Sequence, residues 1–372
     1  MLTLISIVVP GPQDVFTVSF FPNASGGVSA VSLTHENLTA GVASARALLP
    51  LSGAISPLDT IVSGHSLSTA YGRAIAYTAV FEGTNFATLK SSNIINGSGK
   101  STTTCPRNLY VADTCVAESA DLSDIKTADS YPIPSPTIVF GKPSHLTALS
   151  TAILAEAKKS NVLYTLAWRH KFSSILDGFV TKQSLWDRLV FDIARAKIMG
   201  KGAGTVRAVI VSGGMFLTQS SWVEMLIRRV AGTLEAAGLS PARIALSIPL
   251  VNSYIHPTVA GPVFASHPLD VQTFATIPTV PTATAAENYA FTYDSPVGPP
   301  TVNVEAKLTG VNDGAIESGG DPVGALFVRG PSVGKLLYVE SPEGEEDQGW
   351  VETGDRARVL TNGTFKIAPN QK

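Results

Sequence analysis

Short apolar runs alternate with amphipathic segments through the first 260 residues, and this alternation constrains the fold more than any other feature. The runs at 60–65, 136–140 and 206–214 are rich in Val and Ile, as is typical of strands that are buried on both faces. Between them lie segments whose apolar residues recur at helical spacing. Alternating strands and helices predict an α/β fold with mostly parallel sheets flanked by helices.

The first elements are expected to be a strand pair followed by two helices. Residues 16–20 alternate at strand period, and residues 28–33 follow after a turn of small residues, which predicts a hairpin or a loop-linked pair. Thr34 is placed to cap the first helix. The second helix is expected over 68–81, with Gly83 ending it.

Two serines in the middle of the chain indicate further helix starts. Ser144 and Ser184 each precede a segment of helical periodicity, and Asp187 stands at the capping-box position relative to Ser184. The second of these helices is expected to bury one stripe of apolar residues, namely Leu185, Leu189 and Ile193.

A third helix is expected to open at Ser221 and to end near Gly238, before a strand over 243–254. The Ser/Thr-rich stretch 91–135 predicts a surface insertion.

The hydrophobic pattern of the sequence changes from about residue 258, where apolar residues no longer recur at helical spacing. The segments expected to form strands of an antiparallel β subdomain are 302–311, 324–331, 335–340 and 364–368. The chain is therefore predicted to have two parts. Residues 1–260 would form the α/β core, and residues 261–372 would form a β-rich subdomain.

The composition excludes several classes of protein. Hydrophobic residues make up 44% and charged residues 15% of the chain, which excludes a disordered chain or a coiled coil. A formal net charge of −2 argues against binding nucleic acid or an anionic membrane through the bulk of the surface. No apolar run approaches the ~20 residues of a membrane-spanning helix. No Lys or Arg precedes the short apolar stretch at residues 1–9, so no signal peptide is expected and a cytoplasmic location is predicted.

Few residues carry a chemical indication on their own. The Gly-rich turn 25–27 could present backbone N–H groups to a phosphate, although a flexible hairpin turn explains it equally. Asp355 is expected on a turn after a strand, where it could simply satisfy local backbone groups. The six histidines show no ligand spacing with Cys, Asp or Glu, so no metal site is expected.

The order of several segments adds a resemblance that covers residues 14–368. The run 33–38 resembles the segment that follows the phosphate loop in adenylate-forming enzymes. The segments 72–83, 136–140, 211–214, 323–331 and 349–355 follow in the order found in that family. The chain most resembles the long-chain fatty acyl-CoA synthetases among these AMP-binding proteins.

The resemblance implies a chemistry and a set of partners. Family members use ATP and Mg²⁺ to convert a carboxylic acid into an acyl-adenylate, and then transfer the acyl group to coenzyme A. For this chain it implies ATP or AMP with Mg²⁺ as cofactors, coenzyme A if it is active, and a fatty acid or acyl-CoA as partner. Peripheral attachment to the endoplasmic reticulum or the peroxisome stays open as an alternative location.

Part of the nucleotide site is retained by resemblance. Ser25 and Gly26 match the phosphate loop, which also makes Ser25 the one catalytic candidate. Gly213 and Gly214 match the glycines that follow a strand. The remaining matches are the adenine tyrosine and the ribose aspartate, at Tyr254 and Asp355.

Other family positions carry different residues. Ser29 stands where the loop lysine is expected, and Thr258 stands where a glutamate binds Mg²⁺. Ile255 replaces a glycine beside the nucleotide, and Phe21 replaces a polar loop residue. The acyl-tunnel histidine aligns with Thr69.

The family also has a large N-terminal segment and a mobile C-terminal domain with a catalytic lysine, and this chain is expected to lack both. Three functions follow from these differences. The first is a catalytically impaired pseudoenzyme that keeps a lipid or nucleotide pocket and regulates a partner such as an active paralogue. The alternatives are an active acid–thiol ligase and a structural or scaffold subunit, and the sequence also leaves open a fragment of a longer divergent protein.

Overall fold

The computed structural model describes residues 9–22, 27–88, 135–200, 202–213, 234–272, 286–337 and 349–369. Its largest sheet has the strand order β4-β3-β5-β6-β7-β8. The parallel members are β3 (Thr60–Ser63), β4 (Asn85–Thr88), β5 (Ile138–Gly141), β6 (Ala208–Gly213) and β7 (Leu250–Ile255). The edge strand β8 (Pro262–Ala265) runs antiparallel to β7.

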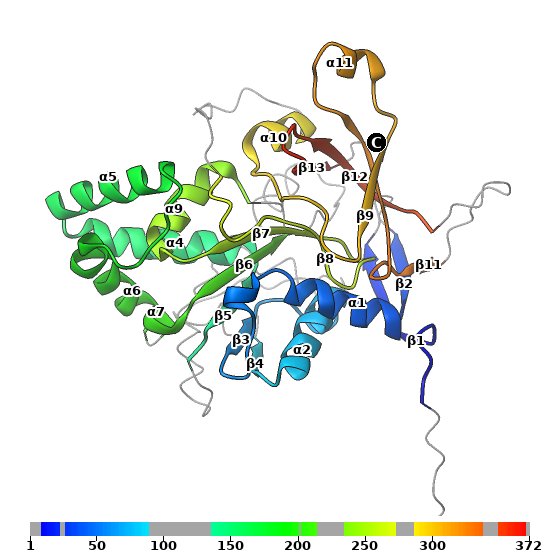
Figure 1. Ribbon diagram of the computed structural model, residues 1–372, viewed down its shortest axis with the longest axis horizontal. Coiled ribbons are helices and arrows are strands. Elements are labelled where there is room, and N and C mark those ends of the chain that lie inside the picture. The colour runs from blue at the N-terminus through cyan, green and yellow to red at the C-terminus, as the bar shows by residue number, and fades with distance from the viewer. Residues whose placement is uncertain are drawn as a thin grey trace, which may run out of the picture.

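Helices cover both faces of this parallel sheet (Figure 1). The helices before β5 are α1 (His35–Arg46) and α2 (Ala70–Glu82), with a short 3₁₀ turn η1 (Leu51–Gly53) between them. The helices between β5 and β7 are α4 (Pro143–Lys158), α5 (Val162–Leu176), the π-helical turn η4 (Asp187–Phe191), α6 (Asp192–Met199), α7 (Gly202–Thr205) and α9 (Ala236–Leu246).

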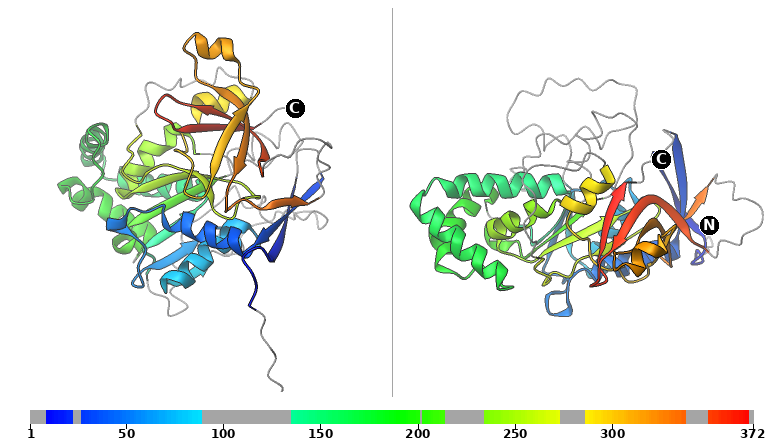
Figure 2. Two further views of the ribbon diagram at one scale, coloured as in Figure 1. Left: turned by 45° about the vertical axis from the view of Figure 1, so that its right-hand side comes forward. Right: turned by 90° about the horizontal axis from the view of Figure 1, so that it is seen from above.

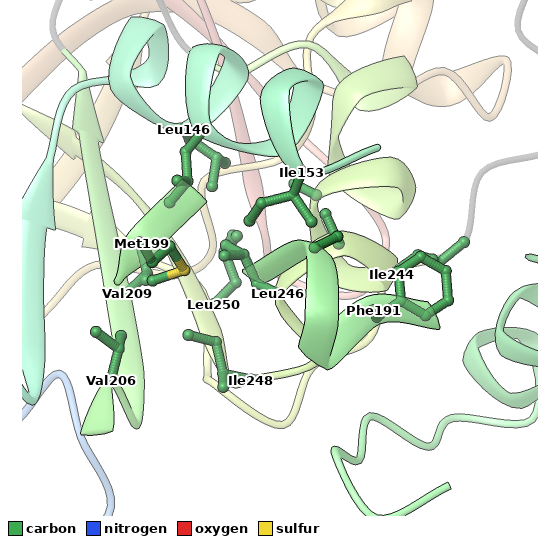
Figure 3. Packing of buried hydrophobic residues seen from close by; sticks show 14 of the residues in the cluster. Leu146, Ile153, Phe191, Met199, Val206, Val209, Ile244, Leu246, Ile248 and Leu250 are labelled. Carbon is green, nitrogen blue, oxygen red and sulfur yellow. The ribbon is translucent and has the colours of Figure 1, made fainter. Parts of the chain in front are cut away.

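Alternate residues of the strands enter two different hydrophobic cores. Val209 and Val211 of β6 pack with α4, α5, α6 and α9 in the first core (Figure 3). Ala208 and Ile210 of the same strand face the second core, beneath α2. Because successive strand side chains point to opposite faces, burial on both faces requires the continuous apolar runs seen in the sequence.

Two smaller antiparallel sheets complete the fold. One has the order β1-β2-β11 and is formed by β1 (Val15–Pro22), β2 (Val28–Thr34) and β11 (Lys335–Leu337). The other has the order β13-β12-β10-β9 and is formed by β9 (Glu305–Thr309), β10 (Val323–Arg329), β12 (Val351–Val359) and β13 (Phe365–Pro369). The right-hand view of Figure 2 shows the green helices at one end of the molecule and these sheets at the other. Two short helices, α10 (Ala286–Tyr293) and α11 (Asp313–Glu317), accompany the second sheet.

The predicted fold class is confirmed, as are most early elements. β1 and β2 form the expected antiparallel pair. Thr34 caps α1 in a capping box with Asn37, and Gly83 ends α2 with a φ of +68°. Strands β8 and β11 lie after residue 260 in the sequence, but β8 pairs with β7 and β11 pairs with β2. The division of the chain into two parts at residue 260 stays a prediction. The insertion 91–135 lies almost wholly outside the described residues, as does the helix start at Ser221.

Two helix boundaries differ from the prediction. The helix expected to begin at Ser144 begins at Pro143, with Lys142 at the N-cap, because proline suits the first helical position. The strand expected over 243–254 begins only at Leu250. Residues 243–246 belong to α9, which passes through Gly238 instead of ending there, and whose buried side chains follow helical spacing.

The stripe expected inside the helix after Ser184 is wrong. Ser184 and Asp187 do form the reciprocal hydrogen bonds of a capping box. The π-helical turn η4 then adds a residue to the turn and rotates the helix, so that Val190 and Phe191 are buried instead. The three residues that were expected in the core are exposed instead: Leu185 by 64%, Leu189 by 46% and Ile193 by 64%.

A buried charge cluster holds this helical layer together. The carboxylate of Asp187 is fully buried and accepts hydrogen bonds from Lys171 Nζ at 2.6 Å and Arg195 Nη2 at 2.9 Å. Burial by itself would raise the pKa of Asp187, but the bonds from Lys171 and Ser184 and the charge of Arg195 hold it below its ordinary value.

We expect Asp187→Asn to lower the free energy of unfolding by about 3 kcal/mol, because it leaves Lys171 and Arg195 buried without their counter-charge. The matched control is Asp192→Asn. Asp192 also pairs with Arg195 but is 46% exposed, so its loss should cost under about 1 kcal/mol. Urea unfolding of both variants measures the difference, and equal losses would contradict this account.

Candidate functional site

The carboxyl ends of β6 and β7 bring together residues that the sequence placed in the candidate site. In an open α/β sheet, ligands bind outside the carboxyl ends of parallel strands. Gly213, the last residue of β6, lies in register with Tyr254 on β7. Ser25, Gly26 and Gly214 lie outside the described residues.

Asp355 joins Tyr254 from the other side of the fold. The Tyr254 hydroxyl donates a hydrogen bond to Oδ2 of Asp355, across 101 positions of sequence. Tyr254 is 0% and Asp355 is 2% exposed. Asp355 was expected on a turn after a strand, but it lies inside β12, where Gly354 with a φ of +75° bends the strand locally.

Burial controls the ionisation of this pair. It raises the pKa of Asp355 to about 7, although the hydrogen bond from Tyr254 acts in the opposite direction. Burial, together with the negative charge of Asp355, raises the pKa of Tyr254 well above its ordinary value. Asp355 therefore keeps its proton to a higher pH than an ordinary carboxyl does, and the phenol of Tyr254 remains neutral.

A second hydrogen-bonded group follows Tyr254 on the same segment. His256 Nε2 lies 3.0 Å from the carbonyl oxygen of Thr353, and its Nδ1 lies 2.6 Å from Thr258 Oγ1. Because a carbonyl only accepts, Nε2 carries the proton and Nδ1 accepts from the Thr258 hydroxyl. Burial lowers the pKa of His256 to about 4, which keeps the ring neutral.

The Thr258 position is thus occupied by internal contacts. Thr258 is fully buried, and its hydroxyl is directed to His256. A hard cation such as Mg²⁺ requires oxygen ligands, usually carboxylates. The residues present at this position do not fit a magnesium ion. The described part of the chain holds no group of three or more His, Cys, Asp or Glu side chains placed to bind a metal.

Apolar side chains border this segment. Ile255 is partly buried against the second core, and the ring of Phe21 lies 6.2 Å from that of His256, edge to face. Both side chains stand where the resemblance implies glycine or a polar residue.

The sequence did not single out a polar network at the same edge of the sheet. The Tyr71 hydroxyl lies 2.8 Å from Ser212 Oγ, which lies 2.7 Å from Ser253 Oγ. His65, just after β3, is buried beside the Tyr71 ring, and its Nε2 has no hydrogen-bond partner. Burial lowers the pKa of His65 to about 3, which keeps it neutral. A polar residue directly after a buried strand is the pattern that could have identified it.

Thr69, aligned with the acyl-tunnel histidine, has a structural role. Its hydroxyl donates to the carbonyl of Ser66 and accepts from the backbone N–H of Gly72, which caps α2. His65, His145 and His256 all follow strands at this edge of the sheet, and none of them stands at the aligned position.

No family model matches the chain. Peroxisomal long chain acyl-CoA synthetase 7 of Arabidopsis thaliana is 24% identical over 372 residues, which cover 98% of this chain and 42% of the relative. Long-chain-fatty-acid–CoA ligase 5 of Mus musculus is 25% identical over 375 residues, which cover 98% of this chain and 43% of the relative. The chain spans less than half the length of these curated relatives.

Solved structures agree on the fold. A malonyl-CoA ligase, in a ternary product complex with methylmalonyl-CoA and AMP, superposes with a TM-score of 0.54 at 12% identity, covering 97% of this chain and 54% of that one. The o-succinylbenzoate coenzyme A synthetase of Bacillus subtilis, in complex with AMP, gives a TM-score of 0.50 at 13% identity, covering 96% and 50%. The chain has the fold of adenylate-forming CoA ligases. It resembles long-chain acyl-CoA synthetases over nearly its whole length.

We expect the stability contributed by Asp355 to fall as pH rises from 4 to 7. In that range the folded chain keeps a proton on Asp355 that the unfolded chain releases at its ordinary pKa of 3.8. Relative to Asp355→Asn, the wild-type chain should lose about 2–4 kcal/mol of unfolding free energy between those pH values. Denaturant unfolding at several pH values measures this difference, in which the contributions of the buried histidines cancel. A constant difference would show that Asp355 titrates normally.

Proposed function

We propose that this chain is a long-chain acyl-CoA synthetase-like member of the adenylate-forming family that has lost the activation chemistry. It would act by binding a fatty acid, an acyl-CoA or a nucleotide, and by regulating a partner such as an active paralogue. The whole-chain resemblance supports the family, and the contacts of Thr258 support the loss of activity.

The observation that carries the proposal is the state of the Thr258 position. By resemblance a glutamate should bind Mg²⁺ here, but Thr258 is fully buried and its hydroxyl is committed to His256. Without the metal, the negative charge that develops on the phosphates during adenylation loses a counter-charge worth several kcal/mol.

The loop supports the same conclusion. Ser29 lies on β2 in register with Phe21, at the position where the family has a lysine. A serine hydroxyl supplies no positive charge to a triphosphate. The positions of Ser29 and Thr258 therefore supply neither the positive charge of a lysine nor a ligand for Mg²⁺. Both charges would stabilise the same transition state, and the residue at one position does not compensate for the loss at the other.

The active-ligase alternative is favoured by the retained pair Tyr254 and Asp355. These are the residues that would contact adenine and ribose by resemblance, and they meet at the carboxyl edge of the sheet with Gly213. Asp355 already accepts from Tyr254, so a ribose hydroxyl would have to use its second oxygen. The name of one relative includes a peroxisomal location, so an active ligase in the peroxisome is part of this alternative.

We expect no pyrophosphate release above background from ATP, Mg²⁺ and any fatty acid from about C8 to about C20. A coupled pyrophosphate assay with the full chain measures this, with a known acyl-CoA synthetase as the positive control. The variant Ser29→Lys/Thr258→Glu should gain Mg²⁺-dependent ATP binding, because it restores both charges. Robust acyl-CoA formation by the unmodified chain would return the protein to the active-ligase class.

Ligand binding separates a binding protein from a scaffold. A ligand at 100 times its Kd stabilises the fold by about 2.7 kcal/mol, so thermal unfolding with AMP, oleate or oleoyl-CoA should shift clearly for a true ligand. We expect Asp355→Asn to reduce the shift given by AMP and to leave that given by oleate unchanged. If none of the three compounds shifts the transition, the scaffold alternative is favoured.

A further inference from the structure

Two buried histidines meet at the carboxyl ends of β3 and β5. His65 follows β3, and His145 lies in the first turn of α4, which begins just after β5. The two strands pair in parallel, so their ends lie side by side. A Cβ atom at Gly64 would lie 2.6 Å from Cε1 of His145, so the ring of His145 packs directly against the backbone next to His65.

The ring of His65 is held in place, but one of its nitrogens is unpaired. The ring of Tyr71 packs against it edge to face at 4.9 Å, and the Tyr71 hydroxyl is itself fixed 2.8 Å from Ser212 Oγ. His65 is 6% exposed, and its buried Nε2 has no hydrogen-bond partner among the described residues. A buried polar atom without a partner costs free energy, which a ligand can recover by pairing with it.

The charge around the two rings comes from one lysine. Nδ1 of His145 accepts from the backbone N–H of Lys142 at 3.3 Å, so Nε2 carries the proton of the neutral ring. Burial and the positive charge of Lys142 lower the pKa of His145 to about 4, and both also lower that of His65. Within the described part of the chain, no carboxylate acts on either ring. The N-terminus of α4 adds positive potential to that of Lys142.

These groups select a carboxylate over other ligands. A metal cation would be repelled by Lys142, and one lysine does not balance the charge of a triphosphate. A carboxylate carries a single negative charge, and its oxygens can accept from Nε2 of His145 and from the ammonium group of Lys142. It can also pair with Nε2 of His65 in either protonation state, because a carboxyl group donates when protonated and accepts when ionised.

The position of this cluster in the sheet indicates which carboxylate it binds. By resemblance, the carboxyl group that reacts with ATP would lie near Tyr254 and Asp355, at the end of β7. β3 lies three strands away in the order β3-β5-β6-β7, about 14 Å at the usual strand spacing. One carboxyl group does not reach both places. Thr69, aligned with the acyl tunnel, follows His65 by four residues, which puts the cluster on the acyl side of the site.

We propose that His65, His145 and Lys142 bind a second carboxylate at the far end of the acyl chain, so that the preferred ligand is a dicarboxylic acid. This inference rests on the function proposed above, because it names the ligand of the same acyl-binding site. A saturated chain of about twelve carbons spans about 14 Å when extended. The methyl end of an ordinary fatty acid would leave the three polar groups unpaired, and sites of this kind discriminate strongly against such a ligand.

The test is isothermal titration of the full chain with dodecanedioic acid and with dodecanoic acid, which have the same chain length. We expect the diacid to bind about tenfold tighter or more. His65→Phe keeps an aromatic ring and removes the unpaired nitrogen. It should weaken binding of the diacid about tenfold, while the free energy of unfolding stays equal or rises. Lys142→Gln should weaken the diacid similarly, and Lys142→Arg should keep the preference.

The matched control is Lys158→Gln, which makes the same charge change at an exposed position at the other end of α4. This variant should prefer the diacid as the wild-type chain does. Equal binding of the two acids by the wild-type chain would overturn the inference, and so would a preference that survives both His65→Phe and Lys142→Gln.

The proposed function fails on different measurements. Equal binding of the two acids would leave lipid binding in place and remove only the preference for a second carboxylate. Pyrophosphate release with dodecanedioic acid as substrate would contradict the loss of activation chemistry and support the diacid as ligand. If neither acid binds, the inference is overturned, and the thermal shifts with AMP, oleate and oleoyl-CoA still decide whether the chain binds a ligand of the proposed function.

Discussion

Strand β7 is the element on which both halves of the structure depend. Leu250 and Val251 at its start enter the two cores on opposite faces of the parallel sheet. Tyr254 near its end enters a third core, shared with β10, β12 and β13. One strand therefore joins the helical layers to the antiparallel sheet, and the buried bond from Tyr254 to Asp355 lies at that junction.

The burial of the candidate-site residues results from this junction between β7 and β12. Residues after β7 would be exposed in a sheet with an open carboxyl edge, but here they are enclosed by β12. Enclosure makes neutral forms favourable, which explains the raised pKa of Asp355 and the lowered pKa of His256. In this enclosed segment the hydroxyl of Thr258 is committed to His256, and this contact is the basis of the proposed loss of activity.

The two ends of the molecule differ in the same physical terms. At the junction, polar groups are buried and satisfy one another. On α5, apolar side chains such as Val162, Leu166 and Leu176 are exposed.

The amino-acid sequence by itself determined the fold class, the early elements and the family resemblance. Short apolar runs such as 208–211 favour strands buried on both faces, and Thr34 with Asn37 can begin a helix through local bonds alone. Only the tertiary structure decided which face of a helix is buried, since the π-helical turn at Asp187–Phe191 exposed Leu189. It also decided the state of Asp355, whose ionisation depends on burial beneath residues distant in sequence. Local patterns record periodicity and capping, but rotation, enclosure and pKa arise from contacts between segments that the pattern does not connect.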